Sequence, residues 1–402
     1  MTTTIPNPLL LIGAPGMVDG LRPQDLQWGV LVSELPRAAH TEILIDGTPA
    51  NTVLVRWCVS ESTEVAVIGP AGTIRLPFGK LFDQMLPVGA LRDLSAAGGY
   101  VGPLLPQAIV MPVSNGEAHV FTRLRYSDQD AIFIRVTDAP FPWDGGVSPA
   151  LIESIARRNN EHQLFLNNHQ CYYERYFRGE EIEHKYTLSG GDIWTATVEL
   201  YNEVRTGFLQ GFVPEYRDEF QTWDYGNHLH AIEEPESERG YISFIPLVGG
   251  GYTVKRKWFA EDAFRRGERM SRETEYIPDF LAYIRESTGL SARALPSFRR
   301  VRYDINFESI RTGHVYGIFF DECTIEDAPE HRLMQCELEY LRTRSVLRRD
   351  EGEIVSEMEE VALWLESFLD QKGFSSKRGT YSKLSFLRDA VSSDGRLLER
   401  YV

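Results

Sequence analysis

Cysteine is scarce in this sequence of 402 residues, and its placement excludes a cysteine-based metal site. The four cysteines lie far apart and form no CxxC or Cys/His spacing; they are Cys58, Cys171, Cys323 and Cys336. The same scarcity of cysteine excludes a disulfide-rich secreted protein. We expect the cysteines to be buried free thiols in a reducing compartment. The expected location is therefore cytoplasmic.

Long hydrophobic runs are also absent. The run PLLLIGAPGMV at residues 8–18 has no basic segment before it. No stretch approaches the roughly 20 apolar residues that a membrane-spanning helix needs. The sequence predicts neither export nor membrane insertion.

Positive charge is in deficit. Lys and Arg number 42 against 58 Asp and Glu, which gives a formal net charge of -16 and an isoelectric point near 5.1. Bulk attraction to DNA or to an anionic membrane is therefore excluded, and an anionic ligand needs a local basic pocket. Hydrophobic residues at 43% and charged residues at 25% are ordinary for a globular protein.

The chain divides into two parts at a segment rich in Pro and Gly, DAPFPWDGGVSP at residues 138–149. Before it, short apolar strands alternate with turn residues and predict a separate all-β domain over residues 1–146. This domain has no chemical motif, and we expect it to bind a protein partner or to form a homo-oligomer. After it, the pattern predicts a helix over residues 149–166 and a second domain over 147–402.

The second domain is predicted to be β-rich α+β. Its periodicity predicts helices at 192–204, beginning at the N-cap Asp192, at 277–288 and at 355–373. Strand patterns occur at residues 180–188, 219–232, 240–249, 251–259, 268–276, 298–308, 314–326 and 332–343. Eight mostly antiparallel strands suffice to close a barrel, which these helices would flank.

Charged residues recur at every second position of several strands. GEEIEHKYTL carries Glu181, Glu183 and Lys185, and CELEYLRTR carries Glu337 and Glu339. On a single strand, alternating charge is typical of a solvated face. Bases show the same spacing in other segments, at Lys255 with Lys257 and at Arg300 with Arg302, and Lys377, Arg378 and Lys383 follow late in the chain.

Acid pairs that face a closed interior need counter-charges or a divalent metal, because like charges about 7 Å apart repel more strongly away from water. Mg²⁺ and Mn²⁺ prefer carboxylate oxygens and commonly bridge them to phosphates. Lys and Arg on neighbouring strands would hold the phosphate oxygens. The pattern therefore indicates metal-assisted phosphoryl chemistry.

The segment EIEHK resembles the ExExK motif of the CYTH superfamily, the triphosphate tunnel metalloenzymes, and the likeness extends over roughly residues 170–390. The resemblance implies an eight-stranded antiparallel tunnel barrel in which acids bind Mg²⁺ or Mn²⁺ and bases hold a triphosphate. The family includes inorganic, thiamine and RNA triphosphatases and class IV adenylate cyclases.

Carried over by motif, the resemblance implies three roles. Glu181, Glu183 and Lys185 would be catalytic. The metal ligands would be Glu181, Glu183, Asp321, Glu337 and Glu339. The substrate would be bound by Lys185, His228, His230, Lys255, Arg272, Arg300, Arg302 and Lys383.

The second strand departs from the family pattern, because His228 and His230 stand where many members have Arg-x-Arg. Histidine is largely neutral at pH 7 and lacks the guanidinium fork, so it predicts a weaker or pH-dependent hold on phosphate.

Three functions remain open on this evidence. The first is metal-dependent hydrolysis of inorganic tripolyphosphate or of an organic or nucleoside triphosphate, in which a Glu not fully used by the metal acts as general base. The second is nucleotide cyclisation of the class IV adenylate cyclase type. The third is a non-catalytic sensor that binds a phosphorylated ligand, a hypothesis motivated by the two histidines and the additional N-terminal domain.

Overall fold

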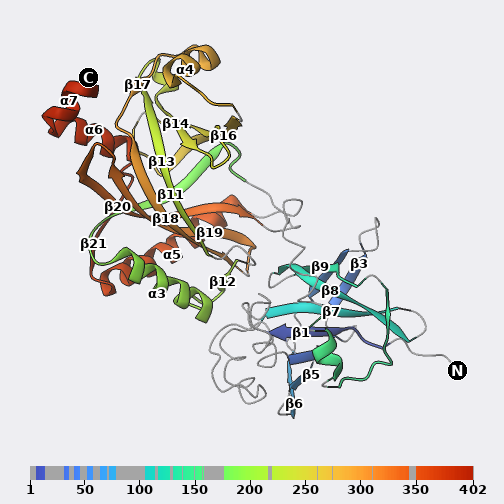
Figure 1. Ribbon diagram of the computed structural model, residues 1–402. Helices are drawn as coiled ribbons and strands as arrows, with labels where there is room; N and C mark the ends of the chain where they lie inside the picture. The colour runs from blue at the N-terminus through green and yellow to red at the C-terminus, as the bar shows by residue number, and fades with distance from the viewer. Residues whose placement is uncertain are drawn as a thin grey trace.

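The structure, a computed structural model, contains two antiparallel sheets that share no strand (Figure 1). It describes residues 6–13, 31–35, 40–45, 52–57, 64–69, 72–77, 105–113, 116–126, 130–137, 139–148, 150–155, 157, 176–215, 220–259, 261–273, 275–309, 311–343 and 350–401. The first sheet ends with β10 (Phe141–Pro142) and the second begins with β11 (Glu180–Gly190). Val147, Leu151 and Ile155 follow the domain boundary that the sequence predicts between residues 146 and 147, and they pack in or against the hydrophobic core of the first sheet.

Among the described residues, the first sheet has ten strands in the order β3-β4-β9-β8-β7-β1-β2-β5-β6, with β10 beside β8. Alternate residues on one face, among them Leu9, Leu11, Val110 and Val120, pack with Trp143 in a hydrophobic core. Of the helix predicted over 149–166, residues 150–155 and 157 are described, and they are helical. The other strands of this sheet are β1 (Leu9–Gly13), β2 (Leu31–Glu34), β3 (His40–Ile45), β4 (Thr52–Trp57), β5 (Glu64–Gly69), β6 (Gly72–Pro77), β7 (Leu105–Val113), β8 (Glu117–Tyr126) and β9 (Asp130–Arg135).

The second sheet closes into a ring of eight antiparallel strands, in the order β13-β18-β19-β20-β11-β16-β15-β14 and back to β13. The ring closes because β13 pairs with β18 along residues 220–227 and with β14 along residues 228–232. Its strands besides β11 are β13 (Phe220–Ile232), β14 (Gly240–Pro246), β15 (Tyr252–Trp258), β16 (Arg265–Glu273), β18 (Phe298–Ser309), β19 (His314–Ile325) and β20 (Ala328–Thr343). All eight correspond to strands that the sequence predicts. Three short strands pair outside this ring: β12 (Phe212–Pro214), β17 (Arg293–Ala294) and β21 (Phe374–Gly379).

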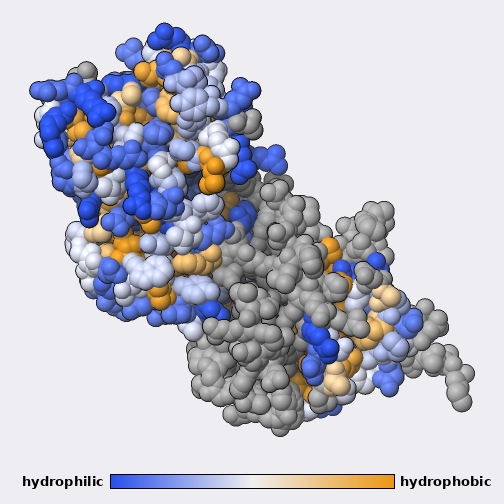
Figure 2. Space-filling model, in the orientation of Figure 1, coloured by the Kyte–Doolittle hydropathy of each residue, from blue (hydrophilic) through white to orange (hydrophobic). Residues whose placement is uncertain are grey.

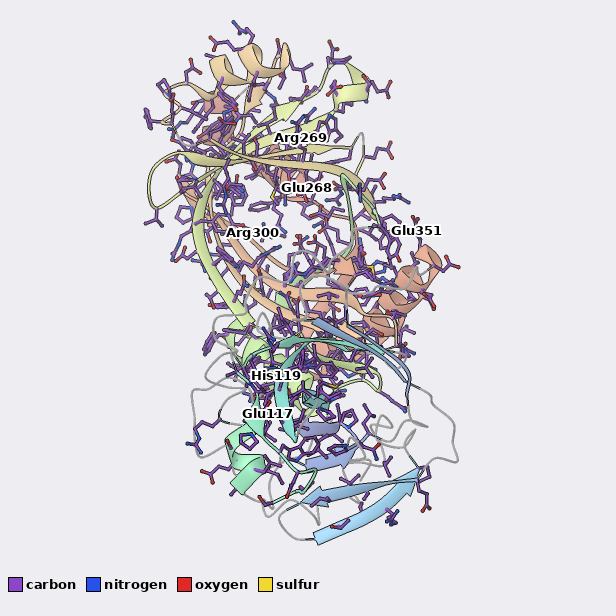
Figure 3. The ribbon with its side chains drawn as sticks, turned by 90° about the vertical axis from the view of Figure 1, so that its right-hand side faces the viewer. Glu117, His119, Glu268, Arg269, Arg300 and Glu351 are labelled. Atoms are coloured by element: carbon purple, nitrogen blue, oxygen red, sulfur yellow. The ribbon has the colours of Figure 1, made fainter. Side chains whose placement is uncertain are left out.

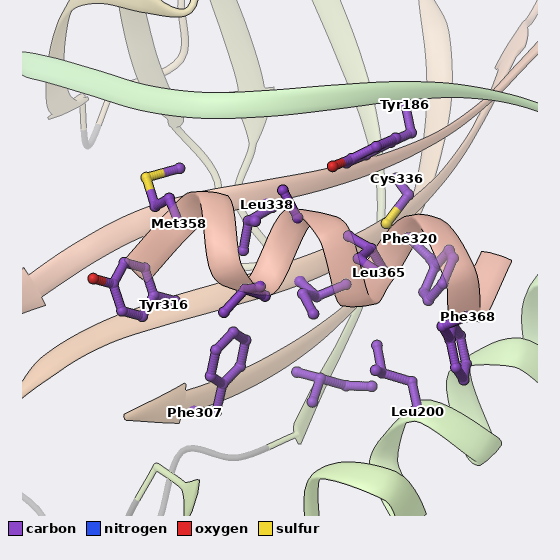
Figure 4. Close-up of a cluster of buried hydrophobic side chains, with 14 of the residues drawn as sticks. Tyr186, Leu200, Phe307, Tyr316, Phe320, Cys336, Leu338, Met358, Leu365 and Phe368 are labelled. Atoms are coloured by element: carbon purple, nitrogen blue, oxygen red, sulfur yellow. The ribbon is translucent and has the colours of Figure 1, made fainter. Parts of the chain in front are cut away.

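The outward faces of the ring are apolar and are covered by helices. Tyr186, Phe320 and Leu338 point from neighbouring strands toward α3 (Ile193–Thr206) and α5 (Glu351–Gln371), as Figure 4 shows. On the opposite wall, β14 and β15 pack in the same way against α4 (Phe280–Thr288). Burying each large apolar side chain contributes about 1.5–3 kcal/mol, so this outer packing turns the alternate, charged residues toward the inside.

The helix ends follow local capping chemistry. Asp192 caps α3, its carboxylate accepting from the Thr195 amide at 2.7 Å, as the sequence predicts. Helix α5 begins earlier than predicted, because Asp350 and Glu353 form a capping box before the first apolar positions. Two further short helices were not predicted from the sequence, α6 (Lys383–Ser393) and α7 (Gly395–Tyr401).

Helix α6 fills one end of the ring. Leu384 and Leu387 pack with Leu229 and Phe298 of the ring in a buried cluster. We call this end the α6 end. The cluster also contains Cys323, which, like Cys336, is buried and free as expected, whereas Cys58 and Cys171 lie outside the described residues.

The surface around the ring is mostly hydrophilic, with small scattered apolar areas, in the view of Figure 2. Within the described part of the chain, no helix has both the length and the apolar character needed to cross a membrane.

Candidate active site

The ring encloses a cavity of about 800 Å³ with an unusually charged wall. Because successive strand residues face opposite sides, the apolar packing outside leaves acids and bases at alternate positions inside. Arg300 on β18 and Glu268 on β16 come from opposite walls, and both are labelled in Figure 3. The charged lining residues are Glu181, Lys185, Asp224, Lys255, Lys257, Arg266, Arg272, Arg300, Arg302, Asp304, Glu337 and Lys383.

Two carboxylates of the wall are fully surrounded by bases, and we call Asp321 and Glu337 the paired carboxylates. Arg300 and Arg302 each grip Asp321 with two nitrogens, at 2.8 and 2.5 Å and at 2.7 and 2.9 Å. Lys383, at the start of α6, donates to Asp321 at 2.7 Å and also to Glu337. Bidentate guanidinium pairs of this kind fix both partners in space.

The register of the strands explains this meeting. Asp321 lies opposite Arg302 on one side and Gln335 on the other, and Glu337 lies opposite Lys185. Glu337 accepts from Lys185 and Arg302 by short contacts and lies 3.2 Å from a second guanidinium. Cross-strand pairing thus places one cation beside each of these two acids, and Arg300 and Lys383 add further contacts to both.

A second group of acids lies nearby with fewer cations, and we call Glu181, Glu183 and Glu339 the crowded carboxylates. Each offers one oxygen, and these three oxygens lie within 4.8 Å of one another. Glu339 is brought there because it pairs with Glu183 across the ladder between β20 and β11. All three side chains are buried.

The pKa values of Glu339 and Glu337, one acid of each group, are shifted in opposite directions. Burial raises the pKa of Glu339 to about 8, and the charges of Glu181 and Glu183 act in the same direction. Burial also acts to raise the pKa of Glu337, but Lys185, Lys383 and Arg302 outweigh it and hold that pKa well below its usual range. Negative charge is therefore compensated at Glu337 and in excess at Glu339. Burial also acts to raise the pKa of Glu181, but Lys257, Lys255 and Lys185 outweigh it and hold that pKa well below its usual range.

The crowded carboxylates fit a divalent cation. Hard cations such as Mg²⁺ and Mn²⁺ take carboxylate oxygens as ligands, and three such oxygens converge here. The Oε2 atom of Glu183 is buried and accepts no hydrogen bond from any described residue, although Oε1 lies 2.7 Å from Lys185 and 3.1 Å from Arg266. A buried carboxylate oxygen without a donor is destabilising unless an ion or water completes it.

A third set of contacts joins two lysines of β15 to acids on β11 and β16. Lys257 forms a short ion pair with Glu181, and Lys255 forms one with Glu268. Burial and the neighbouring charge of Lys257 lower the pKa of Lys255 to about 8. Lys257, whose spacing alone suits a surface position equally well, is buried in the wall.

The two histidines of β13 do not reach the cavity. That strand presents Trp223, Tyr225 and Asn227 inward, so His228 and His230 face outward. His228 Nδ1 lies 2.7 Å from Ser297 Oγ, and His230 packs against the aromatic residues under α4. Burial lowers the pKa of His230 to about 4.

The structure thus brings most of the predicted residues together, but in a different grouping. Of the five predicted metal ligands, three form the crowded carboxylates, whereas Asp321 and Glu337 lie among bases. Of the predicted phosphate contacts, six line the cavity: Lys185, Lys255, Arg272, Arg300, Arg302 and Lys383. Arg378 lies outside the ring, where it pairs with Glu359.

Sequence reasoning missed two buried residues of the wall. Arg266 donates to Glu183, and Glu268 pairs with Lys255. The segment RRGERMSRE has the alternation of an inward-facing strand, but the predicted strand began at residue 268 instead of Arg265. Extending the alternation upstream by one period would have included Arg266.

Comparisons with known proteins were made against family models, curated proteins and solved structures. No family model and no curated protein matches the chain. The chain is similar to the S. pombe Pct1 RNA triphosphatase in complex with the Spt5 CTD, at 11% identity over 56% of this chain and 87% of that one, with a TM-score of 0.22. A second structure of S. pombe Pct1 RNA triphosphatase matches at 14% identity over 48% and 83%, also with a TM-score of 0.22. Scores at this level are too low to rest a fold or a function upon.

Proposed function

We propose that the ring is a tunnel barrel that binds a triphosphate-bearing compound with Mg²⁺ or Mn²⁺ and hydrolyses its terminal phosphoanhydride bond. The observation that supports this most is that three crowded carboxylates, of which Glu181 lines the cavity, lie beside bases of the cavity wall from several strands. Few ligands need both a cation site and many N–H donors, and a metal-bound polyphosphate is one of them.

Charge balance supports the same proposal. Lys185, Lys257, Arg300, Arg302 and Lys383 each contact a carboxylate, so the cavity has little uncompensated positive charge. A bare triphosphate would therefore meet repulsion from the acids. Entry together with a divalent cation removes that repulsion and frees the bases for phosphate oxygens.

The roles of the residues follow from their positions. Glu181, Glu183 and Glu339 would hold the cation, which when bound polarises a phosphoryl oxygen. Arg302 uses Nε and Nη2 on the paired carboxylates, and its Nη1 has no partner among the described residues, so it can donate to a phosphate. Asp321 and Glu337 hold Arg300, Arg302 and Lys383 in place before the substrate arrives, and such preorganisation favours the charged transition state.

The sensor hypothesis loses part of its motivation. It rested on His228 and His230 replacing arginines in the cavity, and both side chains face outward. Arg266 and Arg272 on β16 supply guanidinium groups to the wall.

The deciding experiment is a screen of phosphate release by the full chain from tripolyphosphate, nucleoside triphosphates and thiamine triphosphate, with Mg²⁺, with Mn²⁺ and with EDTA. We expect release with a metal and none in EDTA. Cyclic nucleotide with pyrophosphate as products would favour the cyclase instead. Tight binding without turnover of any compound would favour the sensor.

A further inference from the structure

One end of the cavity carries apolar side chains instead of charges. Leu229 of β13 lies at the α6 end of the cavity, and Trp223, six residues earlier on the same strand, lies at the opposite end. We call the apolar residues of this opposite end the apolar mouth: Trp223, Ile245, Leu247, Val248 and Met270. Trp223 is 48% exposed and Met270 is 59% exposed, which is unusual for large apolar side chains at a cavity.

The apolar mouth lies directly beside the proposed phosphate site. Trp223 is the cross-strand partner of Arg302, and Met270 is the cross-strand partner of Lys255. Partners of this kind are about 5 Å apart between Cα atoms. A ligand whose phosphates contact these cations therefore places its other end among apolar side chains.

Trp223 is held in position rather than free to collapse. Its Nε1 donates to Asp304 Oδ2 at 2.9 Å. The other oxygen, Oδ1, is buried and accepts no hydrogen bond from the described residues, although it lies 3.7 Å from Arg302 Nε. The mouth thus combines apolar walls with one acceptor, the usual composition of a site for an organic molecule.

We propose that the apolar mouth holds the aromatic ring of the substrate, so that the substrate is a small organic triphosphate of the nucleoside triphosphate class and not inorganic tripolyphosphate. This inference rests on the proposed function, because it assigns the phosphates to the charged wall. Tripolyphosphate has no apolar part and would leave the mouth in water, whereas an aromatic ring removes that surface from water and stacks on the indole. A sugar or base N–H or O–H would donate to Asp304.

A nucleotide is favoured over the end of a longer nucleic acid by the charges at the mouth. Asp224 and Asp304 line it with Arg272, and two nearby bases are already paired with these acids, Arg299 with Asp224 and Arg302 with Asp304. A polynucleotide leaving the cavity would carry further phosphates past these acids, whereas binding to a chain of phosphates calls for a basic groove.

The test measures binding without turnover, using full-length protein, Mg²⁺, β,γ-methylene ATP and bis-methylene tripolyphosphate in calorimetric titrations. We expect Trp223→Ala to raise the ratio of the Kd for the ATP analogue to the Kd for the tripolyphosphate analogue about tenfold, since stacking on one aromatic ring typically contributes this much. Trp223→Phe keeps a ring and should restore most of the ratio. Trp194→Ala removes another exposed tryptophan, on α3 and away from the cavity, and serves as the matched control.

If Trp223→Ala weakens the binding of both analogues by the same factor, or of neither, the ratio of the two Kd values is unchanged. That result would overturn the inference. A 5′-triphosphorylated RNA oligonucleotide that binds far more tightly than the ATP analogue, with the same dependence on Trp223, would overturn the choice of a small molecule. The proposed hydrolysis is tested separately. A raised ratio of the two Kd values in Trp223→Ala, together with no phosphate release from any compound by the unmodified protein, would support the role of the apolar mouth and contradict the hydrolysis.

Discussion

Glu337 and Glu339 lie two residues apart on β20, on the same face of the strand, and both are buried, yet their surroundings differ completely. Lys185, Lys383 and Arg302 surround the first, and the pKa of its carboxyl is well below the usual range. The second faces Glu181 and Glu183, and burial with these two charges raises its pKa to about 8. The difference teaches that one motif contains two kinds of acid, one that positions bases and one that awaits a cation.

The largest expected effect concerns the paired carboxylates. Glu337→Gln keeps the side-chain shape but leaves several buried cations without their counter-charge, which typically costs about 3–5 kcal/mol of the free energy of unfolding. Urea denaturation measures it. The control is Glu180→Gln, an exposed acid of the same ring that pairs with Arg265, where we expect about 1 kcal/mol or less. Equal effects of the two substitutions would contradict the comparison.

The crowded carboxylates should respond in the opposite way. The pKa of Glu339 is raised to about 8, so without metal its carboxyl is largely protonated at pH 7, and the neutral side chain of Glu339→Gln should not lower thermal stability in EDTA. Metal-dependent phosphate release should drop at least about a hundredfold. Substituting a residue that only hydrogen-bonds to a metal ligand can already lower activity by this factor, and substituting the ligand itself should lower it at least as much. Calorimetric titration with Mn²⁺ checks whether the loss follows metal affinity. If the Glu339→Gln variant is less stable than the wild type but binds Mn²⁺ with unchanged affinity, the distinction between the crowded and the paired carboxylates is wrong.

A smaller effect tests how the paired carboxylates position their bases. Arg302 bonds Asp321 through two nitrogens, and lysine cannot reproduce that fork. We expect Arg302→Lys to raise KM for the best substrate about tenfold with little change in the melting temperature, since the charge remains. Steady-state kinetics and a thermal melt measure the two quantities. An unaltered KM would show that the orientation of Arg302 is unimportant.

The smallest effect uses a buried acid outside the cavity. Glu357 on α5 accepts hydrogen bonds from Ser309, Thr312 and Tyr316 at 2.7–3.0 Å, and burial raises its pKa although these bonds act to lower it. A raised pKa means that the folded state holds the proton more tightly, so the stabilisation is present below about pH 4.5 and is lost as the pH rises through the folded pKa.

Glu357→Gln, which has no proton to lose, should flatten this dependence. As the pH rises from 4.5 to 8, we expect the melting temperature of the variant to rise relative to that of the wild type. The expected change corresponds to about 1 kcal/mol of the free energy of unfolding. Melts across that pH range, without metal, measure the difference. A difference that stays constant with pH would count against the raised pKa.

How far the sequence predicts the site depends on whether a feature is local. The alternation of charge in EIEHK, YTVKRK, RRVRY and CELEY correctly marks the inward positions, because side chains on a strand point to opposite faces at a period of two. On β13 the prediction came instead from the resemblance to the CYTH superfamily, which placed His228 and His230 where many members have Arg-x-Arg, and it was wrong. There the inward residues are Trp223, Tyr225 and Asn227, and the histidines face α4.

The amino-acid sequence by itself determined the eight strands, the capped start of α3 and the charged face of several strands, since all of these follow from neighbours within a few residues. Only the tertiary structure decided which strands lie side by side. That pairing places Glu339 beside Glu183 and Glu337 beside Lys185, and it brings Lys383 from a helix that the sequence analysis did not predict. Charge at a single position is a local property, whereas the pKa of a buried acid depends on residues more than a hundred positions away in the chain.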